Sequence, residues 1–295
     1  MTNIKVNIVM NCFNGEEYLK EAIDSLIAQT YEDWELIFWD NCSTDKSASI
    51  VKNYNDKRIM YFQASEHTSQ YEARKQAVLK CNREFIAFLD VDDLWVAIKL
   101  ENQLQLFNDD SVGFVSSNYW IINQKNNKKR KVFKSMPKGH VLDKLLVQNF
   151  IGMSSLMVRK KSYFNLEYGF NPKYEIVGDY DLVLRLALKN KFSSTEEPLS
   201  YYRWHGKNLS HQIEKNAEEL KQMVEEMKSI PLFFNNKNFS YFEDFSKYLA
   251  SLGYKLNSDF YKALYEANKI KDIFLKIRIL IILLLPIKII KIIKS

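Results

Sequence analysis

Short apolar runs alternate with amphipathic stretches through the first third of the chain. The apolar runs have the length of buried strands and occupy residues 6–10, 35–39, 58–62 and 84–89. Between them, apolar side chains recur every three or four residues, as at Leu19, Ile23 and Leu26. Because strands that alternate with helices indicate βαβ units, the pattern predicts an α/β fold with a mostly parallel sheet flanked by helices.

The alternation changes after residue 107. The later apolar patterns predict strands over residues 112–116, 119–122 and 155–158, and helices near 141–148 and from 178 onward. Residues 125–134 are basic and Asn-rich, which is typical of a solvated hairpin tip. Beyond His211 the pattern is helical and rich in Lys and Glu. We expect an α/β domain over residues 1–210, a helical extension over 211–268 and a separate tail over 269–295.

The fourth apolar run leads directly into three acids, Asp90, Asp92 and Asp93. Clustered carboxylates repel one another and lose hydration beside a buried strand, unless a cation lies between them. A divalent metal ion is the simplest such cation. The alternative is an acidic turn in which Asp92 or Asp93 caps a helix that begins near Val96.

Polar residues also end other predicted strands. Asn11 follows the first strand and Asp40 follows the second, where Ser43 or Thr44 can cap the next helix. The carboxyl ends of parallel strands share one edge of a sheet, where such sheets bind ligands. With Asp90 at the same edge, the sequence predicts a nucleotide or phosphate crevice.

Two further polar clusters lie in the second half of the chain. Asp179 and Asp181 begin a predicted helix, where the first suits an N-cap and the second suits an interaction with the helix dipole. Arg203, His205 and Lys207 follow a short strand. Either role of the two acids could be purely structural, and a lone histidine such as His205 is more often structural than functional.

Composition adds limits to this picture. With 295 residues, of which 46% are hydrophobic, the chain can bury a full-sized core in one large or two modest domains. Three scattered cysteines are too few for a disulfide framework or a thiolate zinc site, which favours a reducing compartment. The N-terminus lacks the sections of a signal peptide, so we expect a cytoplasmic protein.

The net charge of +6 is concentrated in the tail. Residues 269–295 hold seven cations against one acid, so the remainder is neutral and nucleic-acid binding is not expected. The uncharged run 279–285 is too short to span a bilayer, which takes roughly 20 residues. Lys288, Lys291 and Lys294 share one helical face, which favours an interfacial anchor on an anionic leaflet. The alternative is a helix packed on the protein's own core or on a dimer partner.

Six motifs, in their order, resemble those of the bacterial family 2 glycosyltransferases over roughly residues 4–210. They are Asn11-Cys12-Phe13-Asn14-Gly15, Gln29-Thr30-Tyr31, Asp40-Asn41-Cys42-Ser43-Thr44-Asp45, Glu72-Ala73-Arg74, Phe88-Leu89-Asp90-Val91-Asp92-Asp93-Leu94-Trp95 and Gly178-Asp179-Tyr180-Asp181. The resemblance implies a GT-A fold, a nucleotide-sugar donor and inverting transfer.

The resemblance also implies roles for individual residues. Asp179 matches the general base. The implied nucleotide-binding residues are Asn11, Asp40, Asn41, Arg74, Asp90, Arg203 and Lys207. The implied ligands of a Mn²⁺ or Mg²⁺ ion are Asp90, Asp92, Asp93 and His205. Such an ion would neutralise the departing diphosphate, and carboxylate oxygens suit these hard cations.

Two departures from the family pattern qualify the expectation. Asn11 replaces the usual proline, and Asn41 replaces the second acid after the second strand. An amide donates as well as accepts hydrogen bonds, so the identity of the nucleotide base is open. UDP stays the first expectation, with dTDP and GDP as alternatives. Arg203-Trp204 partly matches the Gln-x-x-Arg-Trp motif of processive relatives, but Leu199 or Ser200 occupies the Gln position, which favours transfer of a single sugar.

The expected function is sugar transfer to a hydroxyl of a glycan or lipid-linked glycan in bacterial surface polysaccharide synthesis, at the inner face of the cell membrane. One alternative is a catalytically silent GT-A domain acting as a scaffold. Another is a nucleotidyltransferase, although Asn14-Gly15 alone is no Gly-rich phosphate loop. The sequence leaves open which sugar moves, which hydroxyl receives it and whether the chain forms a homodimer.

Overall fold

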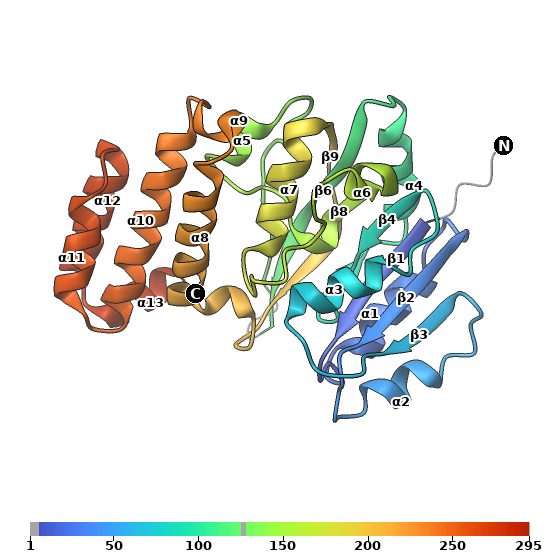
Figure 1. Ribbon diagram of the computed structural model, residues 1–295. Coiled ribbons are helices and arrows are strands. Elements are labelled where there is room, and N and C mark those ends of the chain that lie inside the picture. The colour runs from blue at the N-terminus through green and yellow to red at the C-terminus, as the bar shows by residue number, and fades with distance from the viewer. Residues whose placement is uncertain (1–5, 125–127, 295) are drawn as a thin grey trace. The chain divides into compact units, whose positions relative to one another are not determined.

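The computed structural model describes residues 6–124 and 128–294, the last four by their backbone alone. It divides into two compact units (Figure 1). Unit 1 comprises Met1–Leu142 and Phe150–His205, and unit 2 comprises Asp143–Asn149 and Gly206–Ser295. Each unit has its own secondary structure and is described by itself.

Unit 1 is built on one mixed sheet with helices between the strands. Its strands are β1 (Val6–Cys12), β2 (Trp34–Asp40), β3 (Ile59–Gln63), β4 (Phe85–Phe88), β5 (Leu94–Trp95), β6 (Val112–Asn123), β7 (Lys129–Lys131), β8 (Leu156–Arg159) and β9 (Lys191–Trp204). Its helices are α1 (Leu19–Ile27), α2 (Ser47–Lys52), α3 (Gln70–Val78), α4 (Lys99–Leu104), α6 (Lys160–Phe164) and α7 (Gly178–Lys189), with the short 3₁₀ helices η1 (Gln105–Phe107) and η2 (Met153–Ser155).

The strand order is β3-β2-β1-β4-β8-β6-β9-β5, and β7 pairs with β6. The first four strands are parallel, as the alternating pattern predicts. The half built from β8, β6, β9 and β5 is mixed, with only β6 and β9 parallel. Cys12 lies beside Asp40 and Val9 beside Phe88, so the carboxyl ends of β1, β2 and β4 meet at one edge. The α/β fold is confirmed, and so is the meeting of these strand ends at one edge of the sheet.

The core of unit 1 explains why these segments form strands and helices. All four residues of β4 are buried, since the strand lies in the middle of the sheet. Helix α1 buries Leu19, Ala22, Ile23 and Leu26, the face that its periodicity predicts. The edge where the polar residues gather is therefore attached to a rigid core.

Several local predictions are wrong in detail. The two strands expected over 112–116 and 119–122 are one strand, β6, interrupted by β-bulges. The helix expected over 141–148 is the short α5 (Leu142–Leu145). Part of the expected hairpin tip forms strand β7, and residues 125–127 lie outside the described residues.

The expected helix caps are also wrong. Helix α2 starts after Lys46 and has no side-chain cap from Ser43 or Thr44. Helix α4 starts after Ile98, likewise without a side-chain cap, because the chain first forms β5. Asp92 and Asp93 are therefore not caps. Asp179 lies within the first turn of α7, after Val177 at the N-cap position, so it is not a cap either.

Unit 2 is helical, which confirms the predicted C-terminal helical extension. It contains η3 (Leu209–His211), α8 (Ile213–Met227), α9 (Pro231–Phe234), α10 (Phe239–Leu256), α11 (Phe260–Asn268), α12 (Ile273–Leu284) and α13 (Ile287–Lys294). Helix α10 packs against α8, α11 and α12. An apolar core between these helices includes Tyr248, Leu252 and Ala263.

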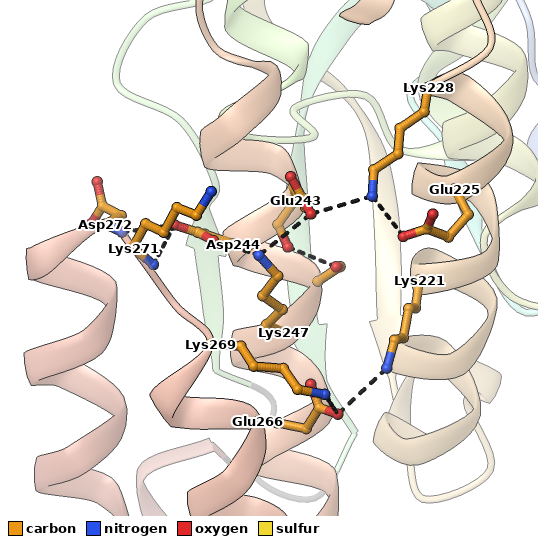
Figure 2. A network of polar contacts seen from close by, with 11 residues as sticks. Lys221, Glu225, Lys228, Glu243, Asp244, Lys247, Glu266, Lys269, Lys271 and Asp272 are labelled. Carbon is orange, nitrogen blue, oxygen red and sulfur yellow. Dashed lines mark hydrogen bonds and ion pairs between the residues drawn. The ribbon is translucent and has the colours of Figure 1, made fainter.

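A polar network joins the helices of unit 2 (Figure 2). Buried Asp244 on α10 accepts hydrogen bonds from the backbone N–H groups of Lys271 and Asp272, at 2.8 and 2.7 Å, and from Lys247 at 2.9 Å. Glu266 on α11 pairs with Lys269 at 2.9 Å and with Lys221 on α8 at 3.4 Å. The chain entering α12 is thus fixed by a charge on α10.

Helix α12 is packed on one side and open on the other. Leu275, Ile279 and Leu283 are buried in the core of unit 2, as is Ile290 of α13. In the described part of the chain, no helix combines the length and the apolar character needed to cross a membrane. The side chains of Lys291 and Lys294, which the sequence places on one face with Lys288, lie outside the described residues.

Candidate active site

The three acids after β4 form a tight turn in which Asp93 points into the protein. The Asp93 backbone N–H donates to the Asp90 carbonyl at 3.1 Å and closes the turn. The two oxygens of the buried Asp93 carboxyl accept from the Ser154 hydroxyl at 2.6 Å and from the Arg203 backbone N–H at 3.0 Å. Burial raises the pKa of Asp93 well above its ordinary value, and Asp92 and Asp90 add to the shift.

Ser154 of η2 holds this turn from the opposite side. Its hydroxyl also accepts the Asp90 backbone N–H at 3.1 Å, and its carbonyl accepts the Trp95 indole N–H at 2.7 Å. The sequence does not single out Ser154, because it lies about sixty positions after the acids and in no motif. One serine therefore connects both ends of the acidic turn.

Asp92 and His205 contact each other at the acidic turn. The His205 Nε2 lies 2.9 Å from Asp92 Oδ2, although the two residues are more than a hundred positions apart. The imidazole stacks on the ring of Tyr18, with centroids 5.2 Å apart, and Asp92 keeps part of its carboxylate exposed. This pair presents one oxygen and one nitrogen at the same point.

Arg203 ties the acidic turn to α1. Its Nε donates to the Asp92 carbonyl at 2.9 Å, and one NH₂ group donates to Glu21 at 2.6 Å. Its guanidinium lies over the ring of Tyr18, 4.7 Å from the centroid. These contacts make Arg203 a support for the turn, and Glu21 and Tyr18 are functional neighbours that no motif indicates.

Arg74 of α3 connects two residues from different strands. Its Nε donates to Asn11 Oδ1 at 2.9 Å, and its terminal nitrogen forms an ion pair with Asp90. The side chain is 2% exposed and lies over the rings of Tyr71 and Phe170. Burial alone would lower the pKa of Arg74, but the surrounding groups, with Asp90 foremost, raise it. Three predicted residues, Asn11, Arg74 and Asp90, thus form one cluster.

Asp179 joins the same cluster from α7. A Cβ atom on Gly178 would lie 2.5 Å from the Tyr71 ring, so the glycine allows α7 to approach α3 closely. Tyr71 also donates from its hydroxyl to the Ile176 carbonyl at 3.1 Å. Burial raises the pKa of Asp179 to about 6, with Arg74 opposing the shift and Asp90 adding to it. The carboxyl of Asp179 is therefore within electrostatic range of both residues.

Asp181, in contrast, has a structural role. Its carboxylate pairs with Arg185 one turn along α7, at 2.5 Å. Arg185 also donates to the carbonyls of Tyr168 and Gly169, at 2.5 and 2.7 Å. The pair fixes the loop that precedes α7.

Asp40 and Asn41 are both buried and bonded within the protein. Asp40 accepts from the Ser43 backbone N–H at 2.7 Å and from the Tyr61 hydroxyl at 2.6 Å. The Asn41 amide exchanges hydrogen bonds with the backbone of Thr68, at 2.8 and 3.1 Å. Their side chains line the edge of the sheet at the carboxyl ends of β1 and β2.

Phe13, to which the sequence motifs assign no role of its own, lies at the same edge of the sheet. Phe13 follows β1 directly, is 49% exposed, and its ring centroid is 4.1 Å from that of His67. An exposed aromatic ring at the carboxyl edge of a parallel sheet suits stacking with a flat ligand.

The predicted residue Lys207 belongs to unit 2, two residues beyond His205.

The side chains at the acidic turn provide some of the ligand atoms that a hard divalent cation needs. Among the residues that the structure describes, no three His, Cys, Asp or Glu side chains form a ready-made metal site. Asp92 and His205 carry suitable donor atoms, which bond to each other here and would turn to a cation bound beside them, whereas both oxygens of Asp93 are held by the Ser154 hydroxyl and the Arg203 backbone. Mg²⁺ is commonly held by one or two carboxylates and completed by substrate phosphates, and this arrangement fits that pattern.

Comparison with known sequences identifies several relatives. The model of "Glycosyl transferase family 2" matches residues 7–165. The chain is 26% identical over 230 residues to the putative teichuronic acid biosynthesis glycosyltransferase TuaG of Bacillus subtilis, covering 69% of this chain and 90% of TuaG. It is 31% identical over 194 residues to WfgD of Escherichia coli, a UDP-Glc:α-D-GlcNAc-diphosphoundecaprenol β-1,3-glucosyltransferase, covering 66% of this chain and 74% of WfgD.

Solved structures share the fold. TarS 1-349 of S. aureus in complex with UDP-GlcNAc has a TM-score of 0.65 at 17% identity, over 91% of this chain and 77% of that chain. The mannosyltransferase PcManGT of Pyrobaculum calidifontis, in complex with GDP-Man and Mn²⁺, has a TM-score of 0.62 at 16% identity, over 89% and 74%. This chain spans 43% of a longer TarS structure. With a family match over more than half of its length and a relative that is 31% identical, the chain belongs to glycosyltransferase family 2.

Proposed function

We propose that this glycosyltransferase moves a single sugar from a UDP-sugar, with inversion, to a hydroxyl of a lipid-linked glycan in surface polysaccharide synthesis. The relatives WfgD and WfaP, 31% and 30% identical, are both named for a UDP-Glc donor and an α-D-GlcNAc-diphosphoundecaprenol acceptor. These names support UDP over dTDP or GDP. They also support an acceptor sugar that carries a lipid diphosphate.

The observation that carries the proposal is that two carboxylates on different elements have different surroundings. Asp92 pairs with His205 at the acidic turn, whereas Asp179 lies on α7 and interacts with Arg74. We assign the first carboxylate to the leaving group and the second to the proton of the acceptor. Inverting transfer needs these two functions and no covalent nucleophile.

Asp179 is the proposed general base. It takes the proton of the acceptor hydroxyl as that oxygen attacks the anomeric carbon of the donor sugar, while the bond to the diphosphate breaks. A carboxyl group whose pKa is about 6 is ionised at pH 7 and is a stronger base than an ordinary aspartate. Arg74 and the N-terminus of α7 keep the ionised form favourable.

Asp92 and His205 are the proposed ligands of a Mn²⁺ or Mg²⁺ ion. The ion would supply positive charge to the departing diphosphate. We assign Asp93 a supporting role in place of its expected role as a ligand, because Ser154 and Arg203 occupy both of its oxygens. Asp90, held by Arg74, is proposed to lie beside the ribose.

The proposed nucleotide site is the carboxyl edge of β1 and β2. Phe13 offers a ring for stacking with the base. The side chains of Asp40, Asn41 and Asn11 line the same edge of the sheet beside it. Arg203 acts through Asp92 and Asp93, whose positions it fixes. Lys207 remains a proposed contact of the diphosphate.

A donor screen tests the proposed function. The purified chain is incubated with Mn²⁺, a panel of UDP-, dTDP- and GDP-sugars, and a water-soluble short-alkyl α-GlcNAc diphosphate. We expect release of UDP with a UDP-sugar and, from an α-linked donor, a β-linked product seen by NMR. An α-linked product would contradict inversion, and no turnover with any donor would support a silent scaffold domain.

We further propose that unit 2 binds an anionic membrane surface through α11 and α12, as a peripheral contact. The apolar residues most exposed there are Tyr261, Tyr265, Ile273, Phe274, Ile277, Ile281 and Leu284. Exposed cations, among them Lys262, Arg278 and Lys288, accompany them. Apolar side chains beside cations are typical of helices at the surface of an anionic bilayer.

Flotation with lipid vesicles tests the membrane proposal. Phe274 and Leu284 are 81% and 82% exposed, and the double variant F274S/L284S is expected to weaken binding to phosphatidylglycerol-containing vesicles by about tenfold or more. The control is Leu232→Ser on α9, 64% exposed, which should bind as the wild type does. Equal binding of all three proteins, or none by the wild type, would refute the proposal.

A further inference from the structure

The hairpin formed by β6 and β7 carries a cluster of exposed cations that the proposed mechanism does not use. Lys128, Lys129, Arg130 and Lys131 follow one another, and all four are exposed. Strand β7 pairs with β6 so that Arg130 lies opposite Ile121 and Lys131 lies opposite Trp120. Successive side chains of a strand point to opposite faces, so Arg130 and Lys131 serve different faces of the hairpin.

The face of Lys129 and Lys131 is occupied by an aromatic cluster. The Lys129 ammonium donates to the Tyr201 hydroxyl at 3.1 Å and lies 4.3 Å from the ring centroid of Trp120. Its distance to the ring centroid of Tyr201 is 4.5 Å. On this face the Lys129 charge is bound within the protein.

The face of Arg130 carries Tyr119, whose ring lies beside the segment that holds the acidic turn. Tyr119 and Ile121 share this face, since they are two residues apart on β6. A Cβ atom on Gly152 would lie 3.3 Å from the Tyr119 ring, and Gly152 immediately precedes η2, whose Ser154 holds the acidic turn. Phe133 packs edge-on against the same ring, with centroids 6.0 Å apart.

The Tyr119 hydroxyl also interacts electrostatically with Asp93, Asp179 and Arg130. Burial raises the pKa of the Tyr119 hydroxyl to about 12, Asp93 and Asp179 add to the shift, and Arg130 opposes it. The Tyr119 hydroxyl therefore interacts electrostatically with the proposed base and with Arg130.

We infer that Arg130 binds the diphosphate of the acceptor, an inference that rests on the proposed function. In a sugar diphosphate the reacting hydroxyl and the diphosphate lie on different carbons of one ring. With that hydroxyl at Asp179, the diphosphate lies about the breadth of a sugar from the base. We assign it to Arg130, which shares a hairpin face with Tyr119 beside the site. The acidic turn would repel such an anion, and an arginine fork matches phosphate oxygens in pairs.

Acceptor kinetics with two soluble substrates test the inference. The first is a short-alkyl α-GlcNAc diphosphate and the second is the matching α-GlcNAc alkyl glycoside, which lacks the diphosphate. We expect Arg130→Gln to raise KM for the first by roughly 10–100-fold, with KM for the donor and for the second acceptor unchanged. Arg130→Lys should recover part of the loss, because it restores charge without the fork.

Lys131→Gln is the matched control, with the same loss of charge one residue away on the opposite face. It should leave both acceptors unaffected, and an equal effect of both variants would overturn the inference as a general charge effect. Unchanged KM for the diphosphate acceptor in Arg130→Gln, with weaker flotation on anionic vesicles, would assign the cation to lipid headgroups and also overturn it.

Failure of the proposed function is recognised separately, as absence of transfer by the wild type with either acceptor. In that case, calorimetric titration of the diphosphate acceptor into the protein without donor measures how much Arg130 contributes to acceptor binding. Weaker binding to Arg130→Gln than to Lys131→Gln supports the inference, and equal binding overturns it.

Discussion

Asp179→Asn is expected to lower the rate of sugar transfer by about 10²–10⁴-fold, the typical contribution of a positioned general base. The substitution keeps the size of the side chain and its oxygen toward the Tyr180 backbone N–H, which lies 2.7 Å from Asp179 Oδ1. It removes the negative charge and, with it, the ability to accept a proton. Donor binding, measured by calorimetry with UDP, should therefore stay close to that of the wild type.

The pH dependence of the wild type follows from the same group. Because the base works only when ionised, and its pKa is about 6, the rate should fall about tenfold per unit as the pH drops below about 6. Above that value the carboxylate is ionised and the rate should level off. This fall should be absent from the residual activity of Asp179→Asn.

Asp181→Asn is the control for this prediction. It lies two residues along the same helix and its charge pairs with Arg185. The variant should lose thermal stability, since it leaves a buried arginine without its carboxylate, while the pH profile stays as in the wild type. Transfer by Asp179→Asn within tenfold of the wild type would show that the base is another group.

Asp92→Asn is expected to lower kcat/KM by on the order of 10²–10³-fold and to weaken the response of the rate to Mn²⁺. An amide has no charge for a divalent cation, and it also changes the hydrogen bond to His205, now 2.9 Å long. The measurement is a Mn²⁺ titration of the transfer rate and of donor binding.

Asp93→Asn distinguishes the role of Asp93 from that of Asp92. Its carboxyl lies between Ser154 and Arg203, so the variant should unfold at a lower temperature. The Mn²⁺ concentration that gives half of the maximal rate should not change. If Asp92→Asn keeps the Mn²⁺ dependence of the wild type and Asp93→Asn loses it, the assigned roles are reversed.

The positions of the predicted residues along the fold follow from local patterns. The apolar runs predict the four parallel strands, and strands of that kind place Asn11, Asp40 and Asp90 at one edge. The helix of Asp179 is predicted from its periodicity, although the cap assigned there is wrong. These features depend on neighbours within a few residues, which a sequence displays directly.

The mixed half of the sheet was harder to predict. The bulges in β6, and the pairing of β6 with β9, depend on contacts between segments about 80 positions apart. The local sequence pattern does not predict the register of β6 and β9, because the free energy of strand pairing comes from contacts with the partner strand.

By itself, the sequence determined which acids occur at the ligand edge and which helix carries the separate acid. Only the tertiary structure decided what each acid can do. Asp92 and Asp93 are neighbours of the same chemical type, yet Ser154 and Arg203 occupy one carboxyl while His205 leaves part of the other exposed. The physical reason is that the pKa, the hydration and the free lone pairs of a carboxylate depend on the atoms around it, and here those atoms come from distant segments of the chain.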